Sequence, residues 1–302
     1  MREHLERCLR ALDRPQYEVI VVDNASTDGS VELVRGQFPE VTLLPLSSNL
    51  GYGTAANRGI EAAAGSFVLL VNADAWPRDP DAVRRLVACA ERSGEAGLVG
   101  PRLIGLDGSP QVSVAGVPSR WWTGTPAISG NRPSPVGKLL LRLRPGRRTF
   151  LVGAALLFRR EAFEQVGGFD PDFFMFSEEI DLCLRMDDGG WDVVFCPEAV
   201  FVHVGGAAAG REPAKMYREQ VRSHLRLLAK RSGVEAAEGA RRFLAIALRV
   251  RALLSSRRRA ALYRETATWL RSAHARQLLR LQDGTPRGRS EASGDRTTGS
   301  AG

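Results

Sequence analysis

The sequence lacks any apolar run long enough to span a bilayer, and its first residues lack the apolar core of a secretory signal peptide. Cysteine is also scarce: the four that occur are far apart, and none forms a CxxC pair. These absences argue against a disulfide-stapled secreted protein. We therefore expect reduced thiols and a cytoplasmic protein.

Acidic residues become scarce toward the carboxyl end. The chain of 302 residues carries a net charge of +8 and has a pI of about 9.9, and the basic excess lies after Arg211. A chain of this length accommodates one large domain, or one domain with an appendage. A basic end is typical of contact with an anionic partner, such as a membrane surface, a nucleic acid or a phosphorylated substrate.

One stretch organises the rest of the chain: the apolar run 67–71, which ends abruptly in Asn72-Ala73-Asp74. A short, partly β-branched run that follows a glycine predicts a strand buried on both faces, as in parallel sheets. Ligands bind just past the carboxyl ends of such strands. A carboxylate there can hold Mg²⁺ or Mn²⁺ together with substrate phosphates, although capping of the next helix is the simpler role for Asp74.

Strands and helices alternate over residues 1–210, which predicts an α/β domain with a mostly parallel sheet. Further strands are expected at 18–23, 41–46, 97–104, 150–158 and 191–204. Helices are expected at 2–12, 31–37, 80–93 and 160–166, with another directly after Gly53.

The alternation breaks between residues 105 and 148, where Gly, Pro and Ser are frequent and Trp121-Trp122 lies in the middle. Loops of this length are usually functional or mobile. Two interpretations of the tryptophan pair stay open, which are local packing and a lid or platform for an acceptor sugar.

A glycine-rich segment, Asn49-Leu50-Gly51-Tyr52-Gly53, directly precedes a predicted helix. Glycine allows a loop to approach a ligand closely, and helix N-termini bind phosphate well. A plain tight turn would produce the same residues, so this segment is a weak signal by itself.

Three acidic residues, Glu178, Glu179 and Asp181, fall in the first turn of a predicted helix that Ser177 would cap. Acids at this position suit the helix macrodipole, which is their structural explanation. The spacing of Asp181 and Arg185 also favours an i,i+4 ion pair. His203 ends the last predicted strand, and a lone histidine in such a place is more often a core residue than a ligand.

Residues 211–283 predict a basic helical extension with helices at 212–230, 234–254 and 258–282. The middle helix places Phe243, Ile246 and Val250 opposite several arginines, which is a basic amphipathic pattern. An arginine-rich solvated face above a packed apolar stripe explains the pattern equally well. Residues 284–302 contain nothing to anchor them, so we expect a disordered tail.

Taken in order, five motifs resemble the family 2 glycosyltransferases of the GT-A fold, and most of all their bacterial rhamnosyltransferase-like branch. The resemblance covers residues 2 to about 230. Its motifs are Val21-Val22-Asp23-Asn24-Ala25-Ser26-Thr27-Asp28-Gly29-Ser30, Asn49-x-Gly51-Tyr52-Gly53-x-x-x-Asn57-x-Gly59, Asn72-x-Asp74, Gly167-Gly168-Phe169-Asp170 with Glu178-Glu179-x-Asp181-x-x-x-Arg185, and Pro197 to His203.

The resemblance implies transfer of a sugar, with inversion, from a nucleoside diphosphate donor that needs a divalent cation, Mg²⁺ or Mn²⁺. It makes Asp74 and His203 the metal ligands, whereas Asn72 departs from the first acid of the family motif. It places Asn24 in contact with the nucleobase of the donor. The donor site that it implies comprises Asp23, Asn24, Asn49, Gly51, Tyr52, Asn57 and Asn72.

The resemblance also assigns the acceptor side. It makes Glu179 the general base, which a helix N-terminus would keep ionised, with Asp181 as the second choice and Glu178 as an orienting residue. The expected donor is dTDP-rhamnose, and the expected acceptor is a glycan or a polyprenyl-diphosphate-linked sugar. We expect the enzyme to be cytoplasmic, to bind the anionic inner face of the plasma membrane peripherally, and to bind no nucleic acid.

Two rival functions remain at the level of the sequence. A sugar-phosphate nucleotidyltransferase would share the nucleotide-binding architecture, but we find no glycine-rich signature with a basic residue in the first loop. A degenerate module that binds nucleotide sugar or glycan is favoured by Asn72 and by the absence of the strand with which family members open. That absence leads us to expect that the natural protein starts upstream of Met1, with an apolar strand.

Overall fold

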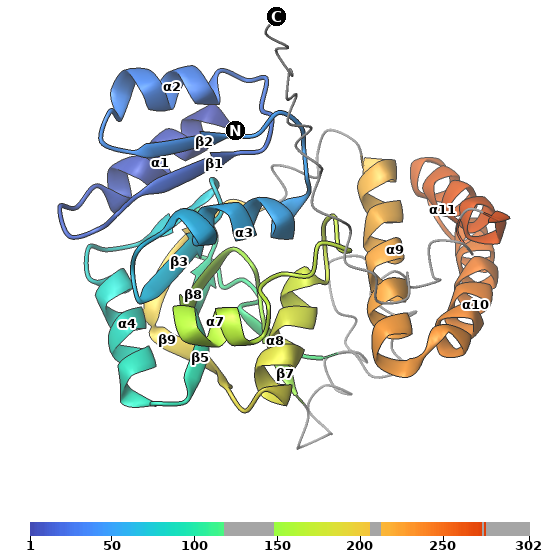
Figure 1. Ribbon diagram of the computed structural model, residues 1–302. Helices are drawn as coiled ribbons and strands as arrows, with labels where there is room; N and C mark the ends of the chain where they lie inside the picture. Colours follow the sequence, from blue (N-terminus) through green and yellow to red (C-terminus); the bar gives the residue numbers. More distant parts are fainter. Residues whose placement is uncertain (118–147, 206–212, 274, 276–302) are drawn as a thin grey trace, which may run out of the picture.

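The computed structural model describes residues 1–117, 148–205, 213–273 and 275. An α/β body is followed by long helices stacked at one side of it (Figure 1). Trp121-Trp122 and the tail 284–302, with the expectations attached to them, lie outside the described residues.

The strands expected from the sequence are all present, with the one expected at 150–158 divided in two, and two short strands, at 75–77 and 114–116, were not expected. The strands are β1 (Ile20–Asp23), β2 (Thr42–Pro45), β3 (Phe67–Val71), β4 (Ala75–Pro77), β5 (Ala96–Ile104), β6 (Val114–Gly116), β7 (Thr149–Leu151), β8 (Ala155–Arg159) and β9 (Asp192–His203).

The helices of the α/β body also lie where the periodicity predicts them. They are α1 (Arg2–Leu12), α2 (Ser30–Gln37), α3 (Tyr52–Ala62), α4 (Ala82–Arg92), α7 (Arg160–Gln165) and α8 (Glu178–Asp188). The helices that follow are α9 (Pro213–Ser232), α10 (Val234–Leu253) and α11 (Arg257–Arg271). None of these described helices is both long enough and apolar enough to cross a bilayer.

The strand pairing is mixed, whereas the sequence predicts a mostly parallel sheet. Five strands pair in the order β3-β8-β5-β9-β4, and only β5 and β9 run parallel among them; β1 and β2 form a separate parallel pair. The pairs β3-β8, β8-β5 and β9-β4 all run antiparallel.

Strand β3 is partly exposed along its whole length, although its sequence predicts burial on both faces. It is an edge strand of the five-stranded sheet and pairs with β8 alone, and β1 pairs with β2 alone, within the described residues. Both strands that lead into the candidate site therefore have one edge without a strand partner there.

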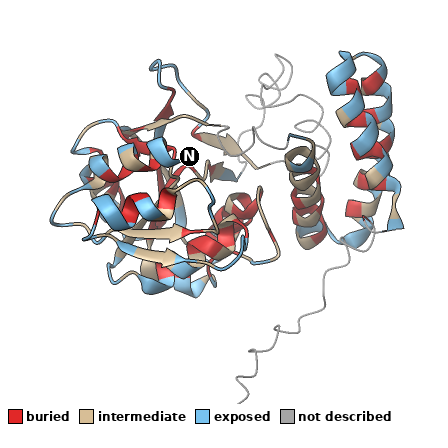
Figure 2. Cartoon of the chain, turned by 90° about the horizontal axis from the view of Figure 1, so that it is seen from above, coloured by how far each residue is buried: buried red, intermediate tan, exposed pale blue. Residues whose placement is uncertain are grey.

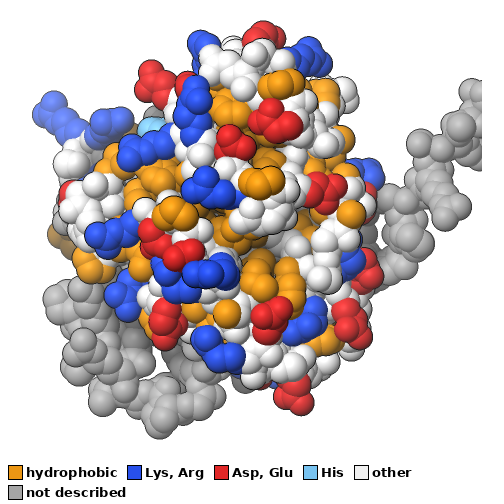
Figure 3. Space-filling model, turned by 90° about the vertical axis from the view of Figure 1, so that its left-hand side faces the viewer, with side chains coloured by type: hydrophobic (Ala, Val, Ile, Leu, Met, Phe, Trp, Pro, Cys, Tyr) orange, Lys and Arg blue, Asp and Glu red, His pale blue; other side chains and the backbone are white. Residues whose placement is uncertain are grey.

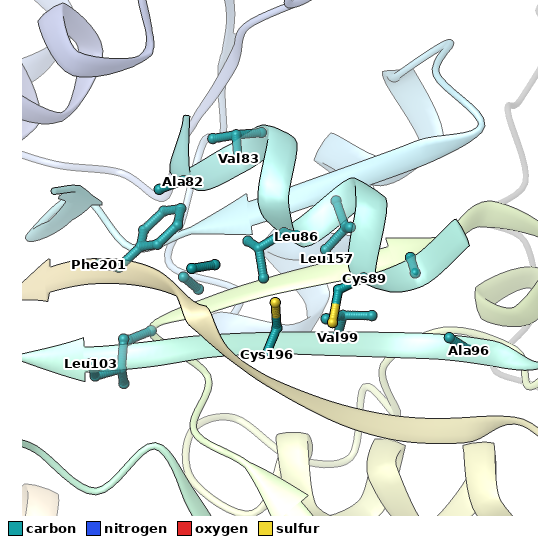
Figure 4. Close-up of a cluster of buried hydrophobic side chains, with 14 residues drawn as sticks. Ala82, Val83, Leu86, Cys89, Ala96, Val99, Leu103, Leu157, Cys196 and Phe201 are labelled. Carbon is teal, nitrogen blue, oxygen red and sulfur yellow. The ribbon is translucent and has the colours of Figure 1, made fainter. Parts of the chain in front are cut away.

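The core that supports the site lies between α4 and the five-stranded sheet. Leu86 and Cys89 of α4 pack against Val99 of β5, Leu157 of β8 and Cys196 of β9 (Figure 4). This packing fixes the strand ends from which the site residues project.

Helix α9 joins the helical extension to the α/β body. Its Leu227 lies in a buried cluster with Phe173, Ile180 and Leu184, while its other face packs in a second core shared with α10 and α11. In Figure 2 the buried residues of these helices face one another, and exposed residues cover their outer sides. The boundary expected at residue 210 is therefore bridged by tertiary contacts of α9.

Candidate active site

Asp74 and His203 meet because β4 runs antiparallel to β9. The register pairs Ala75 with His203, and the Val204 amide donates a hydrogen bond to the Asp74 carbonyl at 3.0 Å. The Nε2 atom of His203 lies 3.7 Å from Oδ1 of Asp74, and the Asp74 side chain is buried. The two residues expected to hold a metal are thus neighbours in space, 129 positions apart in the chain.

Gln111 fixes the chemical form of His203. Its Nε2 donates to the His203 carbonyl at 2.7 Å, so its Oε1 is the atom that lies 3.0 Å from His203 Nδ1. An amide oxygen only accepts, so Nδ1 carries the proton and Nε2 keeps its lone pair on the side of Asp74. Burial lowers the pKa of His203 against the opposing effect of Asp74, which favours this neutral form.

Asn72, which follows β3, adds a third candidate ligand for a metal ion. Its backbone amide donates to the carbonyl of Ala154 at 2.9 Å, whereas its side-chain Oδ1 is buried without a hydrogen-bond partner in the described residues. Two oxygens and an imidazole nitrogen are ligands that Mn²⁺ or Mg²⁺ accepts, and such sites are completed by substrate phosphates. The residues present fit a divalent cation.

Asn24 and Asn49 hold the loop after β1 against the glycine-rich loop. Asn24 Nδ2 donates to Asn49 Oδ1 at 3.0 Å, and Asn24 Oδ1 accepts from the Leu50 amide at 2.8 Å. Asn49 Oδ1 also accepts from the Gly51 amide at 3.0 Å. These bonds shape the loop, and they already use the Asn24 oxygen that was expected to meet a nucleotide base.

Two further residues expected at the donor site have their polar atoms engaged by backbone. Asp23 Oδ2 accepts from the Ser26 amide at 3.1 Å. Asn57 donates to the Phe169 carbonyl at 2.8 Å and accepts from the Phe169 amide at 2.9 Å. The Asn57 amide thus ties α3 to the turn at Phe169, where backbone groups need partners.

Tyr52 lies close enough to Asp74 and to the acidic pair of α8 for their charges to affect its pKa. Its hydroxyl donates to the carbonyl of Gly153 at 2.7 Å. Burial and the nearby carboxylates of Glu178, Glu179 and Asp74 raise its pKa well above the ordinary value, so the hydroxyl stays protonated. Gly51 makes a close approach beside it: its φ of 85° is one that most residues avoid, and a Cβ there would meet the carbonyl oxygen of Phe174 at 2.3 Å.

Glu178 is buried and Glu179 is half-buried, and the Oε2 atom of each lacks a hydrogen-bond partner in the described part of the chain. Burial raises the pKa of Glu179 to about 7, against backbone hydrogen bonds that lower it. Burial and the neighbouring charge of Glu179 raise the pKa of Glu178 well above its usual value. The expectation that the helix N-terminus keeps Glu179 fully ionised is thus wrong, because desolvation outweighs it.

Asp181 does not face the same space. It is fully buried, its Oδ2 accepts from Arg185 Nε at 2.7 Å, and Nζ of Lys230 lies 2.9 Å from the same carboxylate. These ion pairs link α8 to α9. The catalytic role expected for Asp181 stays a prediction.

A strained turn presents the two glutamates. Phe176 and Ser177 have φ of 69° and 67°, in the left-handed region that side chains other than Gly and Asn rarely adopt. The Ser177 hydroxyl does not cap α8 as expected; it lies 3.1 Å from Nδ1 of His224 on α9. Ser223 Oγ donates to the Met175 carbonyl at 2.7 Å. Helix α9 thus holds the turn that precedes the acidic pair.

Sequence reasoning missed four residues that complete this arrangement: Gln111, Gly153, Ser223 and His224. None lies in a motif, and each acts on a site residue that is distant in the sequence. Only for Gly153 was a signal available, because it interrupts the apolar run expected as one strand at 150–158.

The family model for glycosyl transferase family 2 matches residues 1–167. The chain belongs to this family. It is 37% identical over 233 residues to the N-acetylglucosaminyl-diphospho-decaprenol L-rhamnosyltransferase of Mycobacterium tuberculosis, a match that covers 70% of this chain and 75% of that protein. It is 29% identical to the galactofuranosyltransferase GlfT1 of Mycolicibacterium smegmatis, over 68% of each chain.

Among solved structures, the family 2 glycosyltransferase resembles the mannosyltransferase PcManGT from Pyrobaculum calidifontis, with a TM-score of 0.52 and 20% identity. The match covers 92% of this chain and 81% of that one. The expected GT-A fold is thereby confirmed. Family membership does not favour either rival function, the nucleotidyltransferase or the degenerate binding module.

Proposed function

We propose that this glycosyltransferase moves rhamnose, with inversion, from dTDP-rhamnose to a hydroxyl of a polyprenyl-diphosphate-linked sugar in cell-envelope polysaccharide synthesis. One observation carries the proposal for the site: besides burial, the charges of Asp74 and of the Glu178–Glu179 pair all raise the pKa of Tyr52. A diphosphate-binding side and a proton-accepting side are therefore both within electrostatic reach of the half-buried Tyr52.

The donor diphosphate belongs on the side of Asp74. Asp74, His203 and Asn72 supply ligand atoms of the right chemistry for a divalent cation, and Gln111 keeps the His203 lone pair available. When bound, the cation would neutralise the charge that develops on the leaving nucleoside diphosphate. Other donor contacts are proposed for Asp23, Asn24, Asn49, Gly51 and Tyr52.

The acceptor hydroxyl belongs on the side of Glu179. A base must be ionised when the acceptor arrives and must still attract the proton, and a pKa of about 7 satisfies both conditions near neutral pH. The proton passes from the acceptor oxygen to a carboxylate oxygen of Glu179 as that oxygen attacks the anomeric carbon. Glu178, whose pKa burial also raises, lies next to Glu179 in α8 and orients the acceptor.

The relatives support the choice of substrates. The mycobacterial relative at 37% identity is by its name a rhamnosyltransferase that acts on a decaprenyl-diphosphate-linked N-acetylglucosamine. At this identity, and with most of both chains aligned, a related acceptor is the simplest expectation. A lipid-linked acceptor would also place the enzyme at the inner face of the plasma membrane.

A donor panel tests the proposal. The purified protein with Mn²⁺ or Mg²⁺ is incubated with dTDP-rhamnose, UDP-N-acetylglucosamine, UDP-galactofuranose or GDP-mannose, and with a synthetic polyprenyl-diphospho-N-acetylglucosamine. We expect release of dTDP and a rhamnosylated product only when dTDP-rhamnose and the acceptor are both present. EDTA and Asp74→Ala should abolish turnover.

Several outcomes would overturn parts of this proposal. Transfer from another donor alone would replace rhamnose, and undiminished turnover in EDTA would remove the cation. Binding of donor without turnover, in the presence of every acceptor and both cations, would leave a binding module.

A further inference from the structure

Helix α10 exposes a row of large apolar side chains, which we name the α10 stripe: Phe243, Ile246, Val250, Leu253 and Leu254. They are 54% to 85% exposed, and they make up half of the large hydrophobic residues that are exposed in the described chain. Their spacing of three to four residues puts them along one side of the helix. An apolar surface of this kind marks an interaction site rather than a random scatter.

The stripe is exposed because α10 buries a different face. Leu244, Leu248 and Ala252 pack against α9 and α11, together with Ala237. Arg241 is buried with them, and its guanidinium bonds Glu238 and the Leu270 carbonyl. The alternative that the sequence left open, a packed apolar stripe below a solvated arginine face, therefore does not apply to Phe243, Ile246 and Val250.

Arginines surround the stripe, and acids are absent from its neighbourhood in the chain. Between Glu238 and Glu265 the sequence contains eight arginines and no acidic residue. Six of the eight are exposed and pair with no acid among the described residues: Arg242, Arg249, Arg257, Arg258, Arg259 and Arg264. By contrast, the face of the α/β body seen in Figure 3 mixes acidic and basic side chains.

This combination selects the partner. Apolar side chains inside a rim of unpaired guanidinium groups match an interface with acyl chains below and anionic headgroups around. A symmetric contact with a second copy would bring arginine against arginine, which is unfavourable. A phosphate-rich polymer would leave the apolar side chains without a partner.

We propose that the α10 stripe and its arginine rim dock on an anionic lipid bilayer, with the stripe among the acyl chains and the arginines on the phosphates. This surface would bind the enzyme to the membrane on which the proposed function places it. The inference rests on that function, because only a lipid-linked acceptor requires the enzyme to be at a membrane. Helix α9 packs on α10 and also holds the turn before Glu178 and Glu179. Docking therefore fixes the bilayer relative to the acceptor side of the site.

A site-specific probe tests the insertion directly. All four native cysteines are buried, so Ile246→Cys in the full chain introduces an exposed thiol for an environment-sensitive fluorophore. We expect a blue shift of its emission with phosphatidylglycerol-containing vesicles and none with pure phosphatidylcholine. The control is Leu106→Cys, because Leu106 is 61% exposed and distant in sequence from α10. A shift at Leu106 equal to that at Ile246, or no shift at either, would overturn the proposal.

Vesicle sedimentation separates the two components. Phe243→Ser with Ile246→Ser should weaken binding about tenfold or more, whereas the control Leu106→Ser should not. The triple change of Arg257, Arg258 and Arg259 to Gln should weaken binding about 100-fold at low salt. The control is the same triple change at Arg10, Arg35 and Arg84, which should have a smaller effect. Unchanged binding by the stripe variant, or its conversion from dimer to monomer, would contradict membrane docking.

The activity assay is independent of these measurements. With a short-chain, water-soluble acceptor analogue, the stripe variant should keep the parent's turnover. Vesicle binding without any transfer would reject the proposed function but not the docking surface. Transfer without vesicle binding would reject the docking surface but not the proposed function.

Discussion

Glu179 is half-buried, and its Oε2 atom is shielded from solvent without a hydrogen-bond partner in the described residues. Desolvation raises the pKa of Glu179 to about 7. Burial, and after it the charge of Glu179, raises the pKa of the neighbouring Glu178 well above its usual value. The two carboxyl groups therefore ionise in coupled steps.

We predict that kcat rises with pH through a midpoint near 7, as Glu179 loses its proton. Glu179→Gln keeps the shape but cannot accept a proton, so kcat should fall about 10²–10⁴-fold and the inflection should disappear. Steady-state rates of dTDP release between pH 5.5 and 9 (roughly the range that brackets this pKa) measure both effects. If Asp181→Asn removes the inflection and Glu179→Gln does not, the base is misassigned.

The same variant provides a control for burial. A raised pKa means that the folded state holds the proton more tightly than the unfolded chain, so the stability is complete below pH 4.5 and is lost as pH rises through about 7. Glu179→Gln does not titrate, so it should become more stable than the parent above pH 7, by about 1–3 kcal/mol. Urea unfolding at pH 5 and pH 8 should show that the unfolding free energy of the variant, relative to that of the parent, is higher at pH 8 than at pH 5.

Gln111 makes a separate prediction at the scale of one residue. Gln111→Leu removes the acceptor that keeps the His203 proton on Nδ1, so the affinity for Mn²⁺ should fall about 10–100-fold. Titration calorimetry with Mn²⁺ and a nucleoside diphosphate measures it. Gln165→Leu is the matched control, because Gln165 also bonds one side chain, Trp191, but in an exposed place. Equal affinities in the two variants would remove Gln111 from the metal site.

At the scale of elements, α9 determines the position of the acceptor side. It contacts the strained turn through Ser223 and His224, and it forms ion pairs with the preceding loop through Arg226 and Lys230. Two consecutive left-handed residues persist only where their surroundings hold them. The helix that carries the docking surface on its neighbour α10 is therefore also a part of the glycosyltransferase site.

His224 makes α9 sensitive to acid. Burial lowers its pKa from 6.5 to about 4, so the neutral form stabilises the fold fully above pH 6.5, and this contribution is lost as pH falls toward 4. We predict that the parent loses about 2–3 kcal/mol from this source over that window. His224→Asn retains a polar atom near Nδ1 but does not titrate, so it should lose less. If the unfolding free energies of the two proteins fall by the same amount between pH 6.5 and 4, His224 is not the source of the acid sensitivity.

At the scale of the whole molecule, the described strands form three sheets: β1-β2, the five strands β3-β8-β5-β9-β4, and β6-β7. Asp23 ends β1, and Asn72 follows β3 in the five-stranded sheet. Within the described residues, β1 and β3 each have one edge without a strand partner.

Hydrogen exchange should report this division. Amides of β1 and β3 that do not bond β2 or β8 should exchange faster than those of β5, which pairs on both sides. Mass spectrometry of peptides that cover 20–23, 67–71 and 96–104 measures it, and a nucleotide donor should slow the first two. Equal protection of all three peptides at every concentration would mean that the open edges are paired in solution.

The sequence by itself determined the elements and the motifs. Helix 2–12 and strand 67–71 lie where their periodicity places them, because apolar spacing is a local property. The motifs identify the family, and they bring Asp74, His203 and Glu179 into consideration because catalytic chemistry needs those side chains. Pairing of Asp181 with Arg185 was also accessible, since it depends only on one helical turn.

Only the tertiary structure decided which of these side chains face the site. Lys230 pairs with Asp181, Gln111 sets the His203 proton, and desolvation raises the pKa of Glu179 to about 7. Each effect depends on a partner or on solvent exclusion contributed by a distant segment, which no local pattern encodes. The same holds for α10, whose amphipathic sequence allowed either face to be buried until packing against α9 and α11 left the apolar stripe outside.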